Sequence, residues 1–437
     1  MTLSLNLTEE QILNLAPDAG SVKSGKELAN PSKWVSKGAN DRALWGECQG
    51  SGSKPYQTQV DLANIAFKCS CPSRKFPCKH GLGLLLHYAR QSSSFTVTDE
   101  PEWVSSWLSK REEKQEKQTE KKDKPVDEAA QTKRLQAREQ KVNDGIEDLR
   151  LWISDIIRNG IISMPEKGAA WFEQMAKRMV DAQASGLANQ VRNLSDSPFY
   201  SEGWQSGFMD QLLQLYLLIE GYRNSETQDP TLLQDIRTGI GFTQKQEELK
   251  EQPGITDDWL VLAKQSTERD NITTERCWLY GTNTNQYALI LQFIARGQLA
   301  QSILTPGMFV NAELVFYPSV LSMRALIKQQ NSTSSHKTYQ GLNNWKEVAI
   351  AETTAFALLP FRSERPYLVR QLKPVRHKDE WWLQDSNGEI MLLKESHRYI
   401  WKLLSISGGT PLDAALLGKE DKYKVVGIWN NGEYIIL

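Results

Sequence analysis

Four metal-ligating side chains fall within one short run of this sequence, KCSCPSRKFPCKH. They are Cys69, Cys71, Cys78 and His80. Zinc prefers four tetrahedral thiolate or imidazole ligands, and four protein ligands leave no position open for water or substrate. In an extended Cys-x-Cys segment alternate side chains face the same way, so Cys69 and Cys71 can point to one ion. The spacing therefore predicts one structural Zn²⁺ and argues against a catalytic one.

Two other interpretations of the cluster are weaker. Three buried cysteines beside an unrelated histidine would need an improbable coincidence, because the whole chain has only 5 cysteines and 5 histidines. A disulfide would leave one of the three cysteines unpaired, and nothing marks the chain as secreted. The remaining cysteines, Cys48 and Cys277, stand alone in the sequence, and each is predicted to be a small buried hydrophobe.

The run resembles the SWIM-type zinc fingers, whose pattern is C-x-C, a spacer and C-x-H, with a β-hairpin before the metal and a helix after it. The upstream segment fits this shape, with one strand around Leu44 to Cys48, a Gly-Ser turn and a second strand from Tyr56 to about Lys68. The segments WGECQGSG and CPSRKFPCKHGLGLLL are similar to bacterial SWIM proteins in particular. The resemblance covers residues 1–100 and implies zinc binding. It leaves open whether the module binds nucleic acid or protein.

Basic residues surround the predicted ligands, and the segment from Ile65 to Arg90 contains no acidic residue. Such cations could contact phosphates and make binding to DNA or RNA dependent on salt. They could equally stabilise the site itself, because three thiolates around one Zn²⁺ carry a net negative charge. The candidate contact residues are Lys68, Arg74, Lys75, Lys79 and Arg90.

Composition limits the other classes of function. A chain of 437 residues is expected to form two or three domains, and its formal net charge of −1 gives no overall attraction to nucleic acid or to anionic membranes. The N-terminus lacks a cationic start, so no signal peptide is predicted. No uninterrupted apolar segment is long enough to span a membrane as a helix. Reduced cysteines that bind zinc suit a cytoplasmic location.

The pattern along the chain predicts an α+β multidomain protein. From Lys110 to Lys124 no residue is apolar, which predicts a charged linker, either a solvated helix or disordered. Beyond it the apolar period changes to that of helices, and after about Glu275 it changes to that of strands. The predicted units are a zinc-stapled β-hairpin and helix module at 1–109, a linker at 110–140, an all-helical bundle at 141–260, and an α+β domain with a mainly antiparallel sheet at 270–437.

Several elements can be predicted individually. One face of the first bundle helix should bury Ile146, Leu149, Trp152, Ile153, Ile156 and Ile157. A helix is expected from Trp345 to Leu359, and two Asn-Gly pairs predict hairpin turns within the last domain. His87 follows His80 on the same helical face, but the ligand set is complete without it, and a packed or solvated role is expected.

No arrangement of residues in the sequence supports the assignment of a catalytic site. Gly20 to Lys26 fits the start of a phosphate-binding loop, but Glu27 stands where Ser or Thr should hold magnesium. We therefore expect a non-enzymatic zinc protein whose SWIM-like module binds nucleic acid or protein, with protein partners for the other domains. The alternative is an adaptor without nucleic-acid contact, since bacterial SWIM proteins resemble components encoded with MoxR-type ATPases and von Willebrand A proteins. An enzyme with an unfamiliar site in the C-terminal domain is a third hypothesis.

Overall fold

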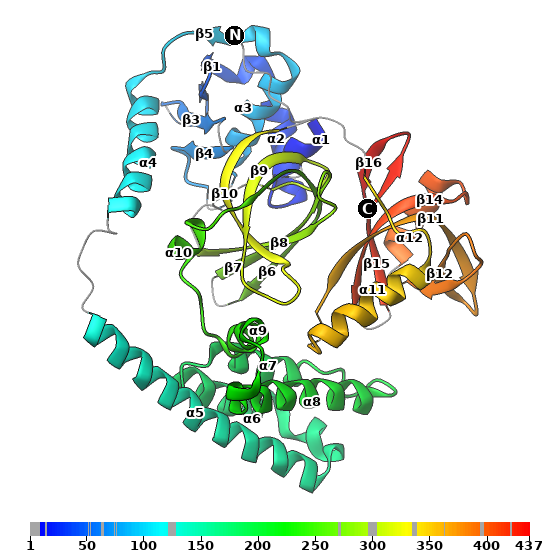
Figure 1. Ribbon diagram of the computed structural model, residues 1–437. Helices are drawn as coiled ribbons and strands as arrows, with labels where there is room; N and C mark the ends of the chain where they lie inside the picture. The colour runs from blue at the N-terminus through cyan, green and yellow to red at the C-terminus, as the bar shows by residue number, and fades with distance from the viewer. Residues whose placement is uncertain are drawn as a thin grey trace.

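The structure is a computed structural model of the 437-residue chain. It describes residues 9–13, 15–50, 52, 54–62, 65–73, 75, 77–120, 128–269, 272–295, 304–333, 339–361, 363–393, 397–419 and 422–437. Four units follow one another along the chain: a small sheet with helices, a helical bundle, a closed barrel and a second, six-stranded sheet (Figure 1).

The N-terminal module is a five-stranded sheet covered by helix α3. Its strand order is β4-β3-β2-β1-β5, with antiparallel pairs except for the short parallel pair of β1 and β5. Two further helices, α1 and α2, pack on α3, and Gly25 and Gly83 let α2 and α3 approach closely. The elements are α1 (Glu9–Leu13), α2 (Ala19–Leu28), β1 (Trp34–Ala39), β2 (Ala43–Cys48), β3 (Tyr56–Asp61), β4 (Ala66–Cys69), α3 (Lys79–Arg90) and β5 (Thr96–Val97).

The module differs in one respect from the expected single hairpin. The strand predicted from Tyr56 to about Lys68 is two strands, β3 and β4, which pair with each other in antiparallel register. The chain reverses direction after Leu62, and Ile65 adopts a positive φ of 45° at the end of the turn. A β-branched residue rarely takes this conformation. The residue type at position 65 therefore gave no indication of a turn there.

Two helices occupy the charged region between the module and the bundle. Helix α4 (Glu102–Glu120) begins with Trp107 buried and Trp103 half-buried against the outer side of the module sheet, and it continues into the predicted linker. Residues 121–127 are not among those described, and α5 starts at Glu128. Of the two alternatives predicted for the charged segment, a helix is present as far as Glu120.

The helical bundle has a hydrophobic core of its own. It is formed by α5 (Glu128–Asn159), α6 (Met164–Asp181), α7 (Ser185–Ser195), α8 (Trp204–Arg223) and α9 (Pro230–Ile240). Four of the six residues expected on the buried face of α5 are buried and Trp152 is partly buried, but Ile157 is half exposed. Trp152 stacks on Trp171 of α6, with ring centroids 4.7 Å apart.

After the short helix α10 (Gln246–Lys250) the chain forms a closed five-stranded barrel. Its first strand was not predicted, and begins at Ile255, within the range 141–260 expected for the bundle. The other four strands confirm the strand predictions for this region. The barrel comprises β6 (Ile255–Arg269), β7 (Ile272–Gly281), β8 (Tyr287–Ala295), β9 (Phe309–Phe316) and β10 (Arg324–Thr333).

The range 270–437, predicted as one α+β domain, is divided between the barrel and a second unit, which is an antiparallel sheet with two helices. Its strand order is β13-β12-β11-β14-β15-β16. Asn431 and Gly432 both adopt positive φ in the turn between the last two strands, which confirms that Asn-Gly hairpin. The elements are α11 (Trp345–Leu358), β11 (Arg365–His377), β12 (Glu380–Gln384), β13 (Ile390–Leu392), α12 (His397–Ser407), β14 (Leu412–Lys419), β15 (Lys422–Asn430) and β16 (Glu433–Ile436).

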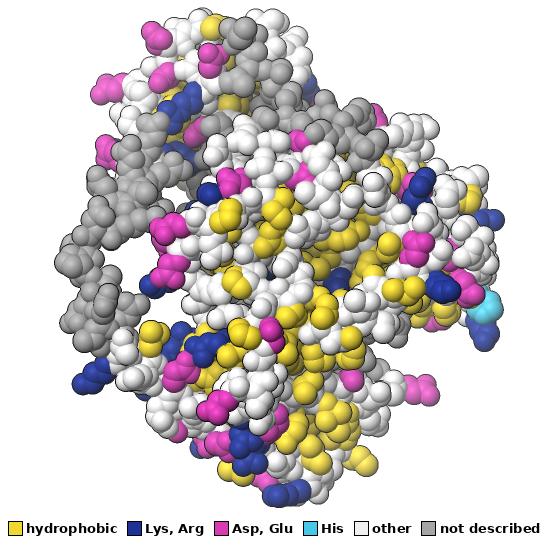
Figure 2. Space-filling model, viewed as in Figure 1, with side chains coloured by type: hydrophobic (Ala, Val, Ile, Leu, Met, Phe, Trp, Pro, Cys, Tyr) yellow, Lys and Arg dark blue, Asp and Glu magenta, His cyan; other side chains and the backbone are white. Residues whose placement is uncertain are grey.

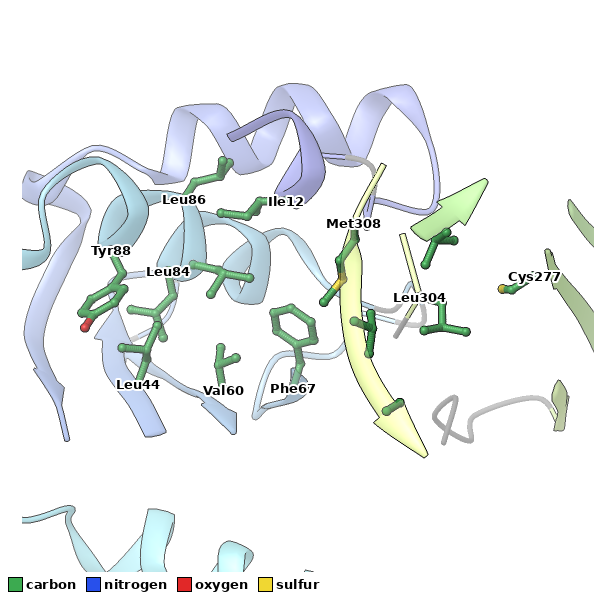
Figure 3. Packing of buried hydrophobic residues seen from close by; sticks show 14 of the residues in the cluster. Ile12, Leu44, Val60, Phe67, Leu84, Leu86, Tyr88, Cys277, Leu304 and Met308 are labelled. Atoms are coloured by element: carbon green, nitrogen blue, oxygen red, sulfur yellow. The ribbon is translucent and has the colours of Figure 1, made fainter. Parts of the chain in front are cut away.

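The barrel lies at the centre of the packing. One buried cluster joins it to the N-terminal module, with Leu304 and Met308 on the barrel side and Ile12 and Phe67 on the module side (Figure 3). A second cluster joins strands β6 and β7 of the barrel to the C-terminal sheet. In the part of the chain that the structure describes, no helix is both long and apolar enough to cross a membrane.

Candidate metal centre

The four predicted ligands meet at the junction between strand β4 and helix α3. Cys69 ends β4, Cys71 lies two residues beyond it, Cys78 caps the N-terminus of α3, and His80 lies in the first turn of that helix. Their four ligand atoms all lie within 4.8 Å of one another. Of the residues described, these alone form a group of three or more Cys, His, Asp or Glu side chains that could hold a metal ion.

The spacing of the ligand atoms suits a tetrahedral zinc ion. Zn–S and Zn–N bonds of ordinary length give tetrahedral edges of about 3.8 Å between sulfurs and about 3.6 Å between sulfur and nitrogen. Sγ of Cys69 lies 3.8 Å from Nδ1 of His80, which is close to such an edge. The widest pair needs to contract by about 1 Å at most to complete the tetrahedron.

Local packing brings the two halves of the site together. A Cβ atom on Gly81 would lie only 2.8 Å from the ring of Phe67 in β4, so glycine at this position lets the first turn of α3 rest directly on the strand. Tyr56 of β3 packs against the imidazole of His80, with ring centroids 5.0 Å apart. These contacts hold strand β4 and the first turn of α3 together at the ligands.

Hydrogen bonds reach two of the ligand sulfurs, and among the three ligand cysteines the pKa is lowered only at Cys78. The hydroxyl of Thr58 lies 3.2 Å from Sγ of Cys69, and the backbone N–H of Gly81 donates to Sγ of Cys78 at 3.5 Å. The hydrogen bond from Cys69, with smaller contributions from His80 and Gly81, lowers the pKa of Cys78 to about 4. The same bond and burial raise the pKa of Cys69, which keeps the shared proton. A zinc ion replaces such protons when it binds.

Two parts of the chain match models of known protein families. Residues 56–89 match the SWIM zinc finger, and residues 137–240 match the SWIM-associated four-helix bundle domain. The chain carries a SWIM zinc finger. The resemblance noted in the sequence is therefore confirmed, and Cys69, Cys71, Cys78 and His80 of this SWIM module are positioned to bind one zinc ion. No curated protein and no solved structure matches the chain.

The basic residues near the zinc site do not form one free cationic surface. Lys75 pairs with Asp18 at the start of α2, with Nζ 2.8 Å from the carboxylate, and this contact holds the pKa of Asp18 down at about 2. Arg90 pairs with Glu9 of α1. These acids lie outside the segment from Ile65 to Arg90, which is why the sequence of that segment gave no sign of them.

The other predicted contact residues have different surroundings. Lys68 and Lys79 are exposed beside the ligands, and no ion pair involves them among the described residues. Arg74 lies outside the described residues. Of the four predicted contact residues that are described, two are therefore exposed without an acidic partner. These two, Lys68 and Lys79, are adjacent in sequence to the ligands Cys69 and Cys78.

Cys48, Cys277 and His87 confirm the expectations for them. Cys48 and Cys277 are buried in β2 and β7. His87 is buried in α3, where its Nε2 lies 3.2 Å from the Ser94 hydroxyl, and burial lowers its pKa. His377 is exposed at the end of β11 and packs edge-on against Trp382.

Proposed function

We propose that this SWIM protein is a non-enzymatic cytoplasmic scaffold that binds protein partners through helix faces outside the zinc module. Its zinc site has a full set of four protein ligands, which suits a structural ion. The observation that carries the proposal is the apolar character of two exposed helix faces, on α8 and on α11. Exposed apolar patches with a polar rim mark protein interaction sites in soluble proteins.

Helix α8 is apolar on more than the face that it buries. Its inner residues, such as Leu212 and Leu215, belong to the bundle core. On the opposite side Leu213 and Leu217 are 50% and 44% exposed, and Tyr216 between them is also exposed. Figure 2 shows hydrophobic side chains gathered over the lower centre of the molecule, where the bundle lies. A helix that is apolar all round is normally covered on all sides.

Helix α11 shows the same feature on the C-terminal unit. Trp345 and Val348 face the core, whereas Ile350 is 57% exposed, and Phe356 and Leu358 are exposed near the C-terminal end of the helix. Lys346 is the only charged residue among the exposed positions of this helix. Together the exposed side chains of the two helices offer a partner apolar area, which Asp210 and Glu220 border on α8.

Nucleic-acid binding by the zinc module is the second candidate. The exposed positions of Lys68 and Lys79 beside the metal site favour it. Two lysines give only a small electrostatic contribution, since each phosphate contact adds one unit to the salt dependence at most. The pairing of Lys75 and Arg90 with acids is the reason that we favour protein partners.

Co-purification from cell lysates, with and without nuclease treatment, tests the proposal. Tagged full-length protein is compared with Leu213→Asp/Leu217→Asp, with Ile350→Asp, and with Gln211→Asp, which adds a charge at an exposed position of α8 outside the apolar face. A protein that is identified by mass spectrometry, retained by wild type and by Gln211→Asp but lost from an apolar-face variant supports the proposal.

Two results of this experiment would contradict the scaffold hypothesis. One is retention of the same proteins by all four forms. The other is loss of every retained protein on nuclease treatment, which would favour the second candidate. Circular dichroism of each variant shows whether the fold is preserved.

A further inference from the structure

The order and direction of the strands identify the type of barrel. Numbered along the chain, its strands lie in the order one, two, three, five, four, and β9 closes the barrel by pairing with both β10 and β6. The third and fifth strands, β8 and β10, are parallel, and the other pairs are antiparallel. The long first strand is bulged between Val261 and Ala263 and serves both halves of the barrel. This is the connectivity of the OB-fold, whose second and third strands form a ligand-binding face.

A shared fold does not establish a shared function, so the side chains on β7 and β8 must carry the argument. Outward side chains near one end of these strands, including Trp278, Tyr280 and Leu289, are covered by the C-terminal sheet. The next outward positions toward the other end lie beyond that cluster. Half of the face is therefore closed and half is open.

The open half combines an aromatic ring with a cation and neutral polar groups. Thr267, Thr274 and Phe293 lie side by side on three neighbouring strands, and Phe293 is 61% exposed. The adjacent row places exposed Arg276 between Gln265 and Leu291.

The acidic residue of β7, Glu275, lies on the other side of the sheet. Glu275 alternates with Arg276 and Thr274 along β7, so it points to the opposite face. There it pairs with Lys264 of β6, with 2.8 Å between nitrogen and oxygen. The two open rows therefore carry no negative charge to oppose an anionic ligand.

The same surface continues around β8 to the start of β10. Leu291 also lines a hollow bordered by Lys250 of α10, Tyr317 and Arg324. The guanidinium of Arg324 lies over the Tyr317 ring, 4.4 Å from its centroid. No acidic side chain lines this hollow, and in the described part of the chain no ion pair involves Arg276, Arg324 or Lys250.

We propose that this barrel surface binds single-stranded nucleic acid. The binding surface consists of Arg276, Phe293, Tyr317, Arg324 and Lys250. Exposed aromatic rings stack on bases, and neighbouring cations follow the phosphates, in grooves that bind single strands without strong sequence preference. A duplex conceals its base faces, so stacking on Phe293 requires an unpaired strand. The proposal goes beyond the scaffold function, because it uses neither the apolar faces of α8 and α11 nor the lysines of the zinc module.

Fluorescence anisotropy with the zinc-loaded full-length protein tests the proposal. The probes are a labelled oligothymidine of about 15 nucleotides, a length suited to one such barrel, and a duplex of equal length. Titrations run at several salt concentrations from about 50 to 200 mM. We expect the single strand to bind more tightly than the duplex. Phe293→Ala should weaken single-strand binding about 5- to 150-fold, the range that loss of one base stack produces.

Three further variants make the test specific. Phe293→Trp should retain binding and Phe293→Leu should lose it, because stacking needs a ring and not merely an apolar side chain. Arg276→Gln should make the log–log salt slope shallower by about 0.7, the contribution of one phosphate contact on a single strand. The double variant Lys68→Gln/Lys79→Gln should bind as wild type does.

The outcomes that would overturn the proposal are distinct. Absence of binding at the lowest salt is one. Equal affinity of wild type and Phe293→Ala is another. Full affinity of Phe293→Leu would show that the position is an apolar contact, as a protein interface would use. Loss of binding in the double lysine variant but not in Phe293→Ala would assign the nucleic-acid contact to the zinc module.

Discussion

Substitution of Cys71 by serine should unfold the SWIM module and leave the helical bundle intact. Binding of structural zinc contributes about 10–16 kcal/mol to folding of small metal modules. The free energy of unfolding of a whole domain is typically only about 5–15 kcal/mol. Loss of the zinc-binding free energy would therefore cancel the stability of the module. The bundle has a separate core, from Val142 to Ile240, with no residue in common with the cluster that contains Phe67.

Hydrogen exchange measured by mass spectrometry, together with zinc analysis, reports both parts of this expectation. In Cys71→Ser we expect less than one zinc per chain and rapid exchange in β3, β4 and α3. Amides in the barrel near Leu304 and Met308 should also exchange faster, because they share the buried cluster of the module. Amides of α5 to α8 should keep the protection that they have in the wild type.

Cys48→Ser is the matched control, since it makes the same chemical change at a cysteine outside the metal cluster. Burial of an unsatisfied hydroxyl there should cost about 1–3 kcal/mol without loss of zinc. A Cys71→Ser protein that retains one zinc and a protected α3 would refute the metal assignment. Faster exchange throughout the bundle would instead refute the independence of the two cores.

Two further predictions concern the contacts of α2. Gly83→Ala should destabilise the module in thermal denaturation, because the new Cβ would lie 2.6 Å from Cβ of Leu28 and overpacking costs about 1–3 kcal/mol. Gly207→Ala in α8 is the control, because a Cβ atom there would have no neighbouring atom within 4 Å. It should stabilise the bundle by about 1 kcal/mol through helix propensity alone. Equal effects of the two substitutions would contradict the packing argument. Asp18 has its pKa lowered from 3.8 to about 2, mainly by Lys75, so its stabilising contribution is present above about pH 4 and is lost as pH falls toward 2. In Asp18→Asn, the acid unfolding curve followed by circular dichroism should be less steep in that interval, and an unchanged curve would argue against the ion pair.

The zinc ligands could be predicted from sequence because the chemistry that selects them is local. Four ligands within one short run define the site without knowledge of the fold. The Asn431-Gly432 hairpin was predictable for the same reason, since both residues adopt the positive φ that a tight turn requires. Features determined by distant residues were not predictable. Asp18 and Glu9 neutralise Lys75 and Arg90 only once α1 and α2 have packed onto the module.

Strand β6 shows why a β-strand can lack the alternation of apolar and polar residues by which strands are predicted. Its segment from Trp259 to Ala263 is buried on both sides, inside the barrel and beneath the C-terminal sheet, so it reads as a continuous apolar run. Immediately before this run, Asp257 is buried and accepts hydrogen bonds from Asn283 and Thr284, a pattern that sequence alone presents as a polar loop. The strand order of the barrel depends on pairings between distant segments, and no local pattern encodes it.

The buried cluster shared by the zinc module and the barrel has a consequence for synthesis of the chain. Phe67 and Met308 are 241 positions apart, so the ribosome needs roughly 12 to 48 seconds to make the second after the first, at about 5–20 residues per second. During that interval the apolar surface around Phe67 has no barrel to cover it. A metal ion that orders the module by itself gives the nascent chain a folded N-terminal unit before its permanent neighbour exists. Zinc supply during translation would then determine how many chains reach the assembled state.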